Sequence, residues 1–211
     1  MESYLNILVV DDYLVVRKGI ELIINESYPN ANVYFAENYT EAIEIIKIVA
    51  IDLVVLDVII NGFEDIKIME NIRKHKKDIK ILVFSCHEEE LYGARYIKNG
   101  ADGFLNKDCS EATLVEAIHS TLKTGSYYSS NVKEKLKKIK VNKTKSNPID
   151  RLSNREFEVA KMLIEGSGNL EIANRLNIQM STVSTYKIRI FEKLDVNNIV
   201  ALSKLFKVDV N

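Results

Sequence analysis

Five short runs of apolar residues alternate with amphipathic segments between residues 5 and 124, and this alternation restricts the fold more than any other feature. The runs are almost free of charge, as strands are when both faces of a sheet are buried. Strands that alternate with helices predict a parallel, doubly wound α/β sheet. The strands are expected at 5–10, 31–36, 51–56, 79–84 and 102–106, and the helices at 13–27, 39–49, 63–75, 88–99 and 110–124.

The pattern changes after Gly125. A lysine-rich stretch, NVKEKLKKIKVNKTKSNP, runs from Asn131 to Pro148 and predicts a flexible linker that is extended by repulsion between its like charges. Only short helical patterns follow, and the first begins with a Ser-x-x-Glu capping box at Ser153 and Glu156. The sequence therefore predicts an α/β domain over 1–129, a linker over 130–148 and a small all-α domain over 149–211.

The net charge of −1 conceals an asymmetry between the two ends of the chain. Residues 1–130 carry 21 acidic and 13 basic residues, a difference of −8, whereas residues 131–211 carry 9 acidic and 16 basic residues, a difference of +7. A basic C-terminal part favours a polyanionic partner such as nucleic acid. Most of the excess lies in the lysine-rich stretch, so charge alone does not decide between DNA binding and a solvated linker.

The sequence shows no sign of a membrane or of secretion. No apolar run approaches the length of a membrane span, and the first expected strand begins too near Met1 to leave room for a signal peptide. The two cysteines, Cys86 and Cys109, form no disulfide framework. We expect a cytoplasmic protein that does not bind membranes.

Polar residues stand at the carboxyl ends of four of the expected strands. Asp11 and Asp12 follow the first strand, Asp57 the third, Ser85 ends the fourth, and Lys107 follows the fifth. Parallel strands bring these ends to one edge of a sheet, where such folds bind ligands. Three carboxylates at that edge predict a Mg²⁺ site, since this cation takes oxygen ligands. Asp57 could then act as a nucleophile on a phosphodonor, with Ser85 and Lys107 contacting the phosphoryl group. Each residue alone is more often a helix cap or a solvated side chain, and only their combination indicates a site.

Four stretches, VVDD, DLVVLD, FS at Phe84 and Ser85, and GADGFLNKD, make residues 4–129 resemble the receiver domains of two-component response regulators. The resemblance implies a flavodoxin-like sheet, and it implies that Asp57 is phosphorylated by the phosphohistidine of a sensor histidine kinase. It further implies that Ser85 and Lys107 contact the phosphoryl group, and that Phe104 is the switch aromatic. The Mg²⁺ ligands that it implies are Asp11, Asp12, Asp57 and the backbone of Ile59.

The chain departs from the receiver pattern after the phosphoacceptor. Ile60 and Asn61 replace the usual Met-Pro pair, and Asp65 replaces a usual glycine. Asn61 or Gly62 could still form a turn, so we expect altered loop geometry with the chemistry retained.

Three further residues differ near the phosphoryl site. Cys86 stands where a very small residue is usual, which could narrow access to the phosphoryl group. Ile59 and His87 occupy positions that influence how fast water removes this group in the family. We hypothesise that the apolar Ile59 slows that loss.

The segment MSTVSTYKIRIFEKL predicts a helix with a buried stripe of Val183, Ile190 and Leu194. Its polar residues suit a helix in the DNA major groove, although a solvated helix would show the same pattern. The candidate DNA-binding residues are Thr182, Ser184, Thr185, Tyr186, Lys187, Arg189 and Lys193.

Residues 149–207 resemble the LuxR-type helix-turn-helix of the NarL/FixJ subfamily of response regulators, through LSNREFEVAKMLIEGSGNLEIANRLNI and TVSTYKIRIFEKLDV. Many members have a lysine and a histidine where this chain has Ser184 and Tyr186, so we expect an altered base preference with DNA binding retained.

These features predict a transcription regulator that is not an enzyme. Phosphorylation of Asp57 with Mg²⁺ would favour a homodimer and thereby change the binding of the helix-turn-helix to double-stranded DNA. Two alternatives remain. One is a Mg²⁺-dependent phosphohydrolase, disfavoured because no second acid stands two residues after Asp57. The other is a receiver that dimerises without phosphorylation. This alternative is suggested by the departures from the receiver pattern at Ile60, Asn61 and Asp65.

Overall fold

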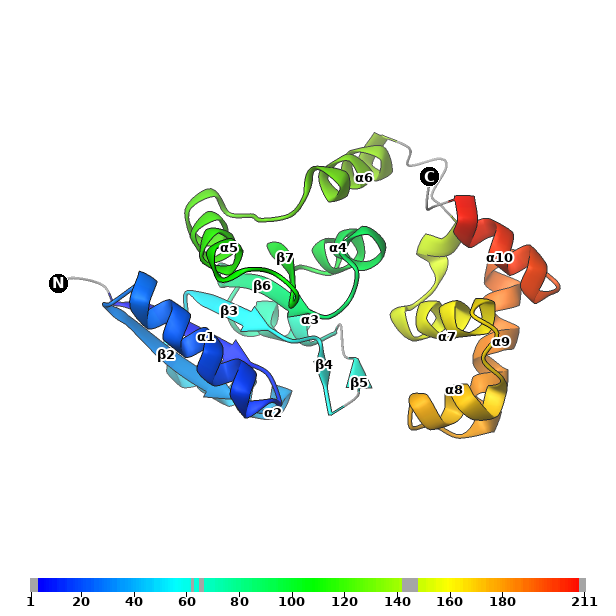
Figure 1. The fold of residues 1–211 in the computed structure, drawn as a ribbon, viewed down its shortest axis with the longest axis horizontal. Helices are drawn as coiled ribbons and strands as arrows, with labels where there is room; N and C mark the ends of the chain where they lie inside the picture. Colours follow the sequence, from blue (N-terminus) through cyan, green and yellow to red (C-terminus); the bar gives the residue numbers. More distant parts are fainter. Residues whose placement is uncertain (1–3, 62, 65–66, 142–147, 209–211) are drawn as a thin grey trace. The chain divides into compact units, whose positions relative to one another are not determined.

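The computed structural model describes residues 4–61, 63–64, 67–141 and 148–208 of the 211-residue chain. The chain divides into two compact units, Met1–Lys138 and Ile139–Asn211 (Figure 1). Within the described ranges, none of the helices combines the length and the hydropathy that a membrane span requires.

The first unit is built on a five-stranded parallel sheet with the strand order β2-β1-β3-β6-β7. The order reverses between β1 and β3, and such a switch point is where doubly wound sheets bind ligands. Val10 pairs with Leu56, so that Asp11 and Asp57 leave the ends of β1 and β3 at the same level. The predicted strands are confirmed as β1 (Leu5–Val10), β2 (Ala31–Ala36), β3 (Leu53–Leu56), β6 (Lys80–Ser85) and β7 (Gly103–Asn106).

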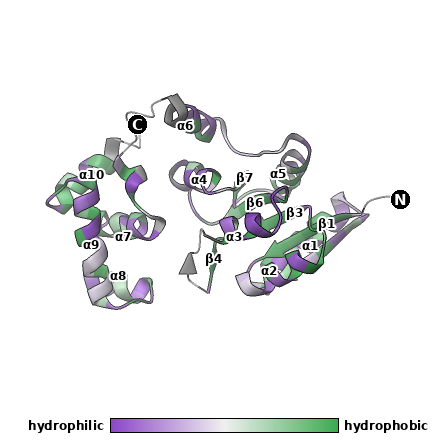
Figure 2. Cartoon of the chain, turned by 180° about the vertical axis from the view of Figure 1, so that it is seen from behind, coloured by the Kyte–Doolittle hydropathy of each residue, from purple (hydrophilic) through white to green (hydrophobic). Residues whose placement is uncertain are grey.

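Helices cover both faces of this sheet, as the alternation predicts. On one face, Ile20 and Ile24 of α1 and Ile118 of α5 pack on alternate strand residues such as Val9 and Val55. The helices α2 and α3 pack against each other on the opposite face (Figure 1). Figure 2 shows the central strands as hydrophobic between these layers. The helices are α1 (Leu14–Ser27), α2 (Tyr39–Ile48), α3 (Lys67–His75), α4 (Glu89–Lys98) and α5 (Glu111–Thr124).

The segment after Asp57 differs from the prediction. The expected helix over 63–75 begins only at Lys67, because a small antiparallel hairpin of β4 (Ile59–Ile60) and β5 (Phe63–Glu64) precedes it. Ile60 pairs with Phe63, which leaves the dipeptide Asn-Gly between the strands, and Asn61 has a left-handed φ of 53°. Asn-Gly is a strong hairpin signal because asparagine and glycine tolerate positive φ. The altered loop geometry predicted here is therefore a hairpin turn at Asn61.

The predicted linker is also partly wrong, since Ser130–Val141 form a helix, α6. The Ser129 hydroxyl caps it by accepting the N–H of Val132 at 3.3 Å. Val132 is fully buried, and lysine is a good helix former when its charge stays in water. The part of the linker prediction over 142–147 lies outside the described residues.

The second unit is all-α, as predicted. The capping box at Ser153 and Glu156 is confirmed at the start of α7. The buried stripe of α9 is confirmed too, because Val183 and Ile190 are 0% exposed and Leu194 is 5% exposed. The elements are a 3₁₀ turn (Pro148–Arg151), α7 (Asn154–Ile164), α8 (Asn169–Arg175), α9 (Met180–Leu194) and α10 (Ile199–Val208).

Candidate functional site

Three carboxylates gather at the ends of β1 and β3. Asp11, Asp12 and Asp57 each offer an oxygen, and these oxygens all lie within 4.8 Å of one another. Asp11 and Asp57 are buried, at 1% and 6% exposed. Such a cluster of buried like charges is stable only with a cation close by.

Lys107 supplies one such cation. Its Nζ donates to Asp11 Oδ2 at 2.6 Å and to Asp57 Oδ2 at 2.7 Å. Burial raises the pKa of Asp57, and the hydrogen bond from Lys107 only partly offsets this. Burial opposes the charge on Lys107 as well, but its bonds to Asp11 and Asp57 outweigh burial and raise its pKa. Lys107 therefore remains charged and bridges two strand ends that lie far apart in the sequence.

Backbone N–H groups orient the same carboxylates. Tyr13 N–H donates to Asp11 Oδ1 at 2.8 Å, and Ile59 N–H donates to Asp57 Oδ1 at 2.9 Å. Asn61 N–H, from the hairpin turn, donates to Asp12 Oδ2 at 2.8 Å.

One carboxylate oxygen has no such partner. Asp12 Oδ1 is buried, and no hydrogen bond reaches it within the described part of the chain. Its position beside the oxygens of Asp11 and Asp57 fits a hard cation that binds carboxylates.

The two other predicted residues lie on neighbouring strands. Ser85, at the end of β6, is fully buried, and its Oγ accepts the N–H of His87 at 3.2 Å. Phe104 of β7 is 1% exposed, and its ring stacks on Tyr96 with centroids 5.7 Å apart. The structure thus brings Asp11, Asp12, Asp57, Ser85 and Lys107 to one edge, whereas Phe104 lies in the interior.

Sequence reasoning missed a buried cation beside the pocket, Arg17 of α1. Its Nη1 donates to the backbone oxygen of Asp11 at 2.6 Å, and its Nη2 pairs with Glu37. Arg17 is 4% exposed and fixes the loop that carries the aspartates. The available signal was a lone arginine on the otherwise apolar face of α1.

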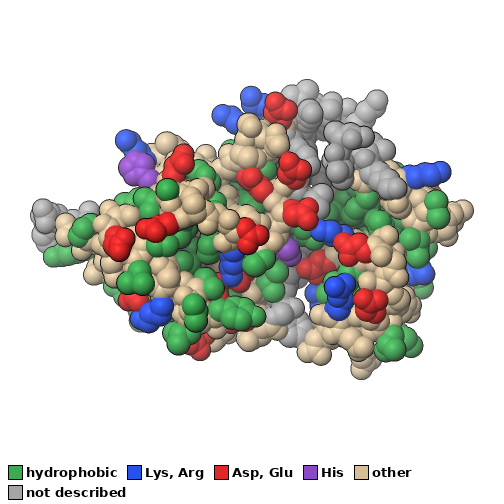
Figure 3. Space-filling view, viewed as in Figure 1, with side chains coloured by type: hydrophobic (Ala, Val, Ile, Leu, Met, Phe, Trp, Pro, Cys, Tyr) green, Lys and Arg blue, Asp and Glu red, His purple; other side chains and the backbone are tan. Residues whose placement is uncertain are grey.

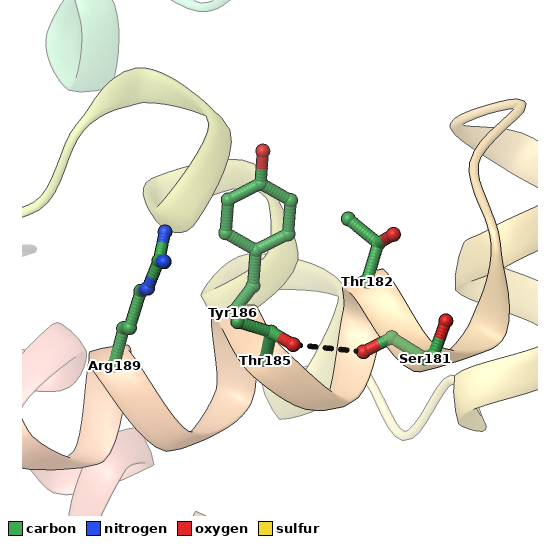
Figure 4. A pocket seen from close by; sticks show the side chains of 5 residues that line it. All are labelled: Ser181, Thr182, Thr185, Tyr186 and Arg189. Carbon is green, nitrogen blue, oxygen red and sulfur yellow. Dashed lines mark hydrogen bonds between the residues drawn. The ribbon is translucent and has the colours of Figure 1, made fainter.

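The second unit presents its polar residues differently, along the exposed side of α9. A pocket of about 290 Å³ lies there, lined by Ser181, Thr182, Thr185, Tyr186 and Arg189. Figure 4 shows Thr182, Tyr186 and Arg189 projecting from the same side of the helix. Thr185 Oγ1 donates to the backbone oxygen of Ser181 at 3.0 Å, so this hydroxyl is engaged within the helix.

Besides Thr185, three of the predicted DNA-binding residues contact other groups of the protein. Ser184 Oγ accepts from Asn169 Nδ2 at 3.2 Å and so joins α9 to the start of α8. Lys193 Nζ donates to buried Glu156 at 2.6 Å. Lys187 Nζ lies 5.8 Å from the centroid of the Phe191 ring. DNA contacts by all seven candidate residues stay predictions.

Two protein families match the two units. The family described as "Response regulator receiver domain" matches residues 7–119, and the family described as "Bacterial regulatory proteins, luxR family" matches residues 150–206. The response regulator UvrY of Escherichia coli is 30% identical over 203 residues, which cover 95% of this chain and 93% of that protein. The chain belongs to the response regulators.

Other relatives agree with this assignment. The Fimbriae Z protein of Escherichia coli is 28% identical, over 96% of this chain and 98% of that protein. A two-component response regulator of the LuxR family from Aurantimonas sp. is 27% identical with a TM-score of 0.58, over 66% of this chain and 100% of that one. RcsB from Salmonella enterica serovar Typhimurium, bound to the promoter rprA with the phosphomimetic BeF₃⁻, is 23% identical with a TM-score of 0.61. The alignment covers 96% of this chain and 98% of the RcsB chain, and it supports the assignment of the fold.

Membership in this family decides among the predicted functions. Response regulators with a receiver and a LuxR-type domain are DNA-binding transcription regulators and not enzymes, so the phosphohydrolase alternative is wrong. Among the departures of this response regulator, Cys86 is exposed and Ile60 is buried, while Asp65 lies outside the described residues.

Proposed function

We propose that this response regulator controls transcription in the cytoplasm through phosphorylation of Asp57 by a sensor histidine kinase. The observation that carries the proposal is the pocket at the ends of β1 and β3. Asp57 is buried there beside two further carboxylates and is held by Lys107 Nζ at 2.7 Å. An aspartate that served only as a helix cap would need neither of these neighbours.

The pocket suits Mg²⁺ as its cofactor. Asp11, Asp12 and Asp57 would hold the cation through carboxylate oxygens, with the backbone of Ile59 as a further ligand. The buried and unpartnered Asp12 Oδ1 supports this donor set. When bound, Mg²⁺ would neutralise charge on the phosphoryl oxygens.

The side chains of this chain would carry the transfer itself. A carboxylate oxygen of Asp57 attacks the phosphorus atom, and the bond between phosphorus and the kinase's histidine nitrogen breaks, so no proton has to leave Asp57. The Lys107 ammonium then pairs with the phosphoryl oxygens, and the Ser85 hydroxyl donates to one of them. Ser85 is near enough in the fold because β3 and β6 are neighbours in the sheet.

The second unit would bind double-stranded DNA through α9. Thr182, Tyr186 and Arg189 lie on one exposed side of the helix, where they could reach base edges and phosphates in a major groove. The phosphorylated chain would bind paired half-sites as a homodimer, and a solved structure of two RcsB dimers bound to DNA supports binding as a dimer. In functional terms, we divide the chain into a receiver over 1–129, a linker over 130–148 and the DNA-binding domain over 149–211.

The test is the intact mass of the protein after incubation with Mg²⁺ and acetyl phosphate, a small phosphodonor. Wild type should gain one phosphoryl group, and Asp57→Asn should gain none. Asp108→Asn is a matched control, because this exposed aspartate follows Lys107 but lies outside the carboxylate cluster. Equal uptake by wild type and Asp57→Asn would contradict the proposal. No uptake by either would favour the receiver that dimerises without phosphorylation.

A further inference from the structure

The carboxylate of Asp12 is oriented by a donor from a distant part of the chain. Its Oδ2 accepts the N–H of Asn61, 49 residues later, at 2.8 Å. The two other carboxylates of the cluster each accept an N–H from two residues further along, within their own loops. Such local bonds form readily wherever an aspartate begins a turn. The bond to Asp12, in contrast, requires the hairpin of β4 and β5 to be in place.

The turn of this hairpin is held in one conformation. Asn61 has a left-handed φ of 53°, and the strand residue before it, Ile60, is buried at 5% exposed. Figure 1 shows the hairpin outside the five-stranded sheet, to which it is joined through the end of β3. The side chain of Asn61 is exposed, so its backbone N–H is the group that the turn offers to the pocket. Asparagine and glycine adopt a left-handed φ with little strain, whereas β-branched residues do not.

The receiver pattern has proline where this chain has Asn61. Proline has no backbone N–H, and its ring fixes φ near −65°. A chain with the usual residue therefore cannot donate to the second aspartate of the pocket from this position. The bond between Asn61 and Asp12 exists because this chain departs from the pattern.

The two oxygens of Asp12 have different roles in this arrangement. Oδ2 is engaged by the turn, while Oδ1 is buried and accepts no hydrogen bond within the described residues. An oxygen of Asp12 also lies within 4.8 Å of one from Asp11 and one from Asp57. Rotation of the Asp12 carboxylate would break the bond to Asn61, so the turn holds this ligand in the cluster. Groups that orient a metal-binding carboxylate in this way contribute to the affinity for the metal.

We propose that Asn61 is a positioning residue whose backbone N–H holds Asp12 for Mg²⁺ and thereby sets the Mg²⁺ concentration that phosphorylation of Asp57 requires. This inference rests on the proposed function and adds the residue that governs cation affinity in this chain. A ligand held in its binding geometry loses less conformational freedom when the cation binds. Because Asn61 acts through Asp12, its loss changes the affinity for Mg²⁺ and leaves the rate of transfer at saturating Mg²⁺ unchanged.

The experiment is a calorimetric titration of the full, unmodified chain with Mg²⁺ alone. Three variants change how well residue 61 tolerates its left-handed φ. Asn61→Gly keeps the N–H and the conformation, so it should bind Mg²⁺ as wild type does. Asn61→Ala should bind more weakly, and Asn61→Val should bind about tenfold more weakly.

Asn177→Val is the matched control. Asn177 lies in the second unit and has a similar left-handed φ of 48°. The same substitution there introduces the same kind of backbone strain away from the carboxylates, so the affinity for Mg²⁺ should equal that of wild type. Urea denaturation shows whether each variant is folded. If Asn61→Val does not fold, the comparison of Asn61→Ala with Asn61→Gly provides the test.

A second readout separates positioning from a general structural defect. Phosphoryl uptake from acetyl phosphate is followed by intact mass over a range of Mg²⁺ concentrations. For Asn61→Val, the Mg²⁺ concentration at half-maximal rate should rise about tenfold, and the rate at saturating Mg²⁺ should equal that of wild type. A general defect in the pocket would instead lower the rate at every Mg²⁺ concentration, and that result would overturn the inference.

The outcomes distinguish this inference from the proposed function. Equal Mg²⁺ affinities of wild type and Asn61→Val, with a phosphoryl group on both, would overturn the positioning role and leave the proposed function standing. Equal weakening in Asn61→Gly and Asn61→Val would also overturn it, because the side chain of Asn61 would then be the important group. A wild type that binds Mg²⁺ but takes up no phosphoryl group would overturn the proposed function, and with it the inference that rests on it.

Discussion

The two units of this response regulator build their polar sites in opposite ways. In the first unit, carboxylates and a lysine from separate strands meet at one edge of the sheet, where Asp11 is 1% and Asp57 is 6% exposed. In the second unit, the candidate contacts line one exposed side of the single helix α9. The first site is made by topology and the second by the face of one helix.

The difference in burial determines how much each lysine contributes to the stability of its unit. Lys107 is held between two buried carboxylates, and its side chain is 13% exposed. Lys193 also binds a buried carboxylate, that of Glu156, but its own side chain is 42% exposed. A buried charge that loses its partner is costly, whereas solvent screens an exposed pair. The comparison therefore predicts unequal costs for equivalent substitutions.

Lys107→Met should have the largest effect on stability. It leaves Asp11 and Asp57 facing each other without a cation, which should lower the free energy of unfolding of the first unit by about 3–5 kcal/mol. Added Mg²⁺ should restore much of this loss. Urea denaturation with and without Mg²⁺, read by hydrogen exchange of peptides from β1 and β3, measures both effects. A urea midpoint equal to that of wild type would mean that the ion pairs of Lys107 with Asp11 and Asp57 contribute nothing to stability.

Arg189→Ala should come next, and its effect is on DNA binding. Arg189 is exposed and is proposed to contact DNA, and loss of such a contact should weaken binding by about 1–3 kcal/mol. Ser184→Ala is the comparison variant, because its hydroxyl already bonds to Asn169. We expect it to bind DNA nearly as wild type does. Titration of a labelled duplex at fixed salt distinguishes them, and a larger loss for Ser184→Ala would reverse our interpretation of the helix face.

Lys193→Met should have the smallest effect, about 1 kcal/mol on the second unit after allowance for solvent screening. Burial alone would raise the pKa of Glu156, but the bonds from Lys193 and Ser153 outweigh it and lower this pKa. A carboxyl group whose pKa is lowered on folding stabilises the fold at pH values above its unfolded-state pKa. This stabilisation is lost as the pH falls through the folded-state pKa. The difference between Lys193→Met and wild type should therefore shrink on acidification. Thermal denaturation across acidic pH tests this, and a difference independent of pH would contradict it.

The sequence predicted most of the fold because continuous apolar runs mark the buried strands and amphipathic periodicity marks the helices. It also predicted which residues meet at the sheet edge, since parallel strands place Asp11, Asp57 and Lys107 there whatever the helices do. A turn at Asn61 was expected, but the two short strands that flank it were missed, because the helical pattern that follows was extended too far towards them. The helix α6 was missed because the lysines suggested repulsion, whereas Val132 packs on α4.

Sequence could not show which polar side chains of α9 are already engaged. Ser184 and Arg189 both belong to the predicted polar faces, yet Ser184 bonds to Asn169 of α8 and Arg189 lines the exposed pocket. Those contacts depend on how α8 meets α9, which periodicity does not determine. Periodicity likewise could not show that the buried Arg17 donates a hydrogen bond to the backbone oxygen of Asp11. Figure 3 shows hydrophobic side chains on the visible face of the molecule. The exposed apolar residues of α1 include Leu14 and Val15, and no prediction used them.

The most direct test of the central claim compares DNA affinity before and after phosphorylation. A duplex is first selected by the phosphorylated protein from a random library. Its binding is then titrated at fixed salt with wild type and Asp57→Asn, each with and without Mg²⁺ and acetyl phosphate. We expect the phosphodonor to raise the affinity of wild type by on the order of tenfold and to leave that of Asp57→Asn unchanged. Equal affinities of phosphorylated and unmodified wild type would contradict the coupling between the two units.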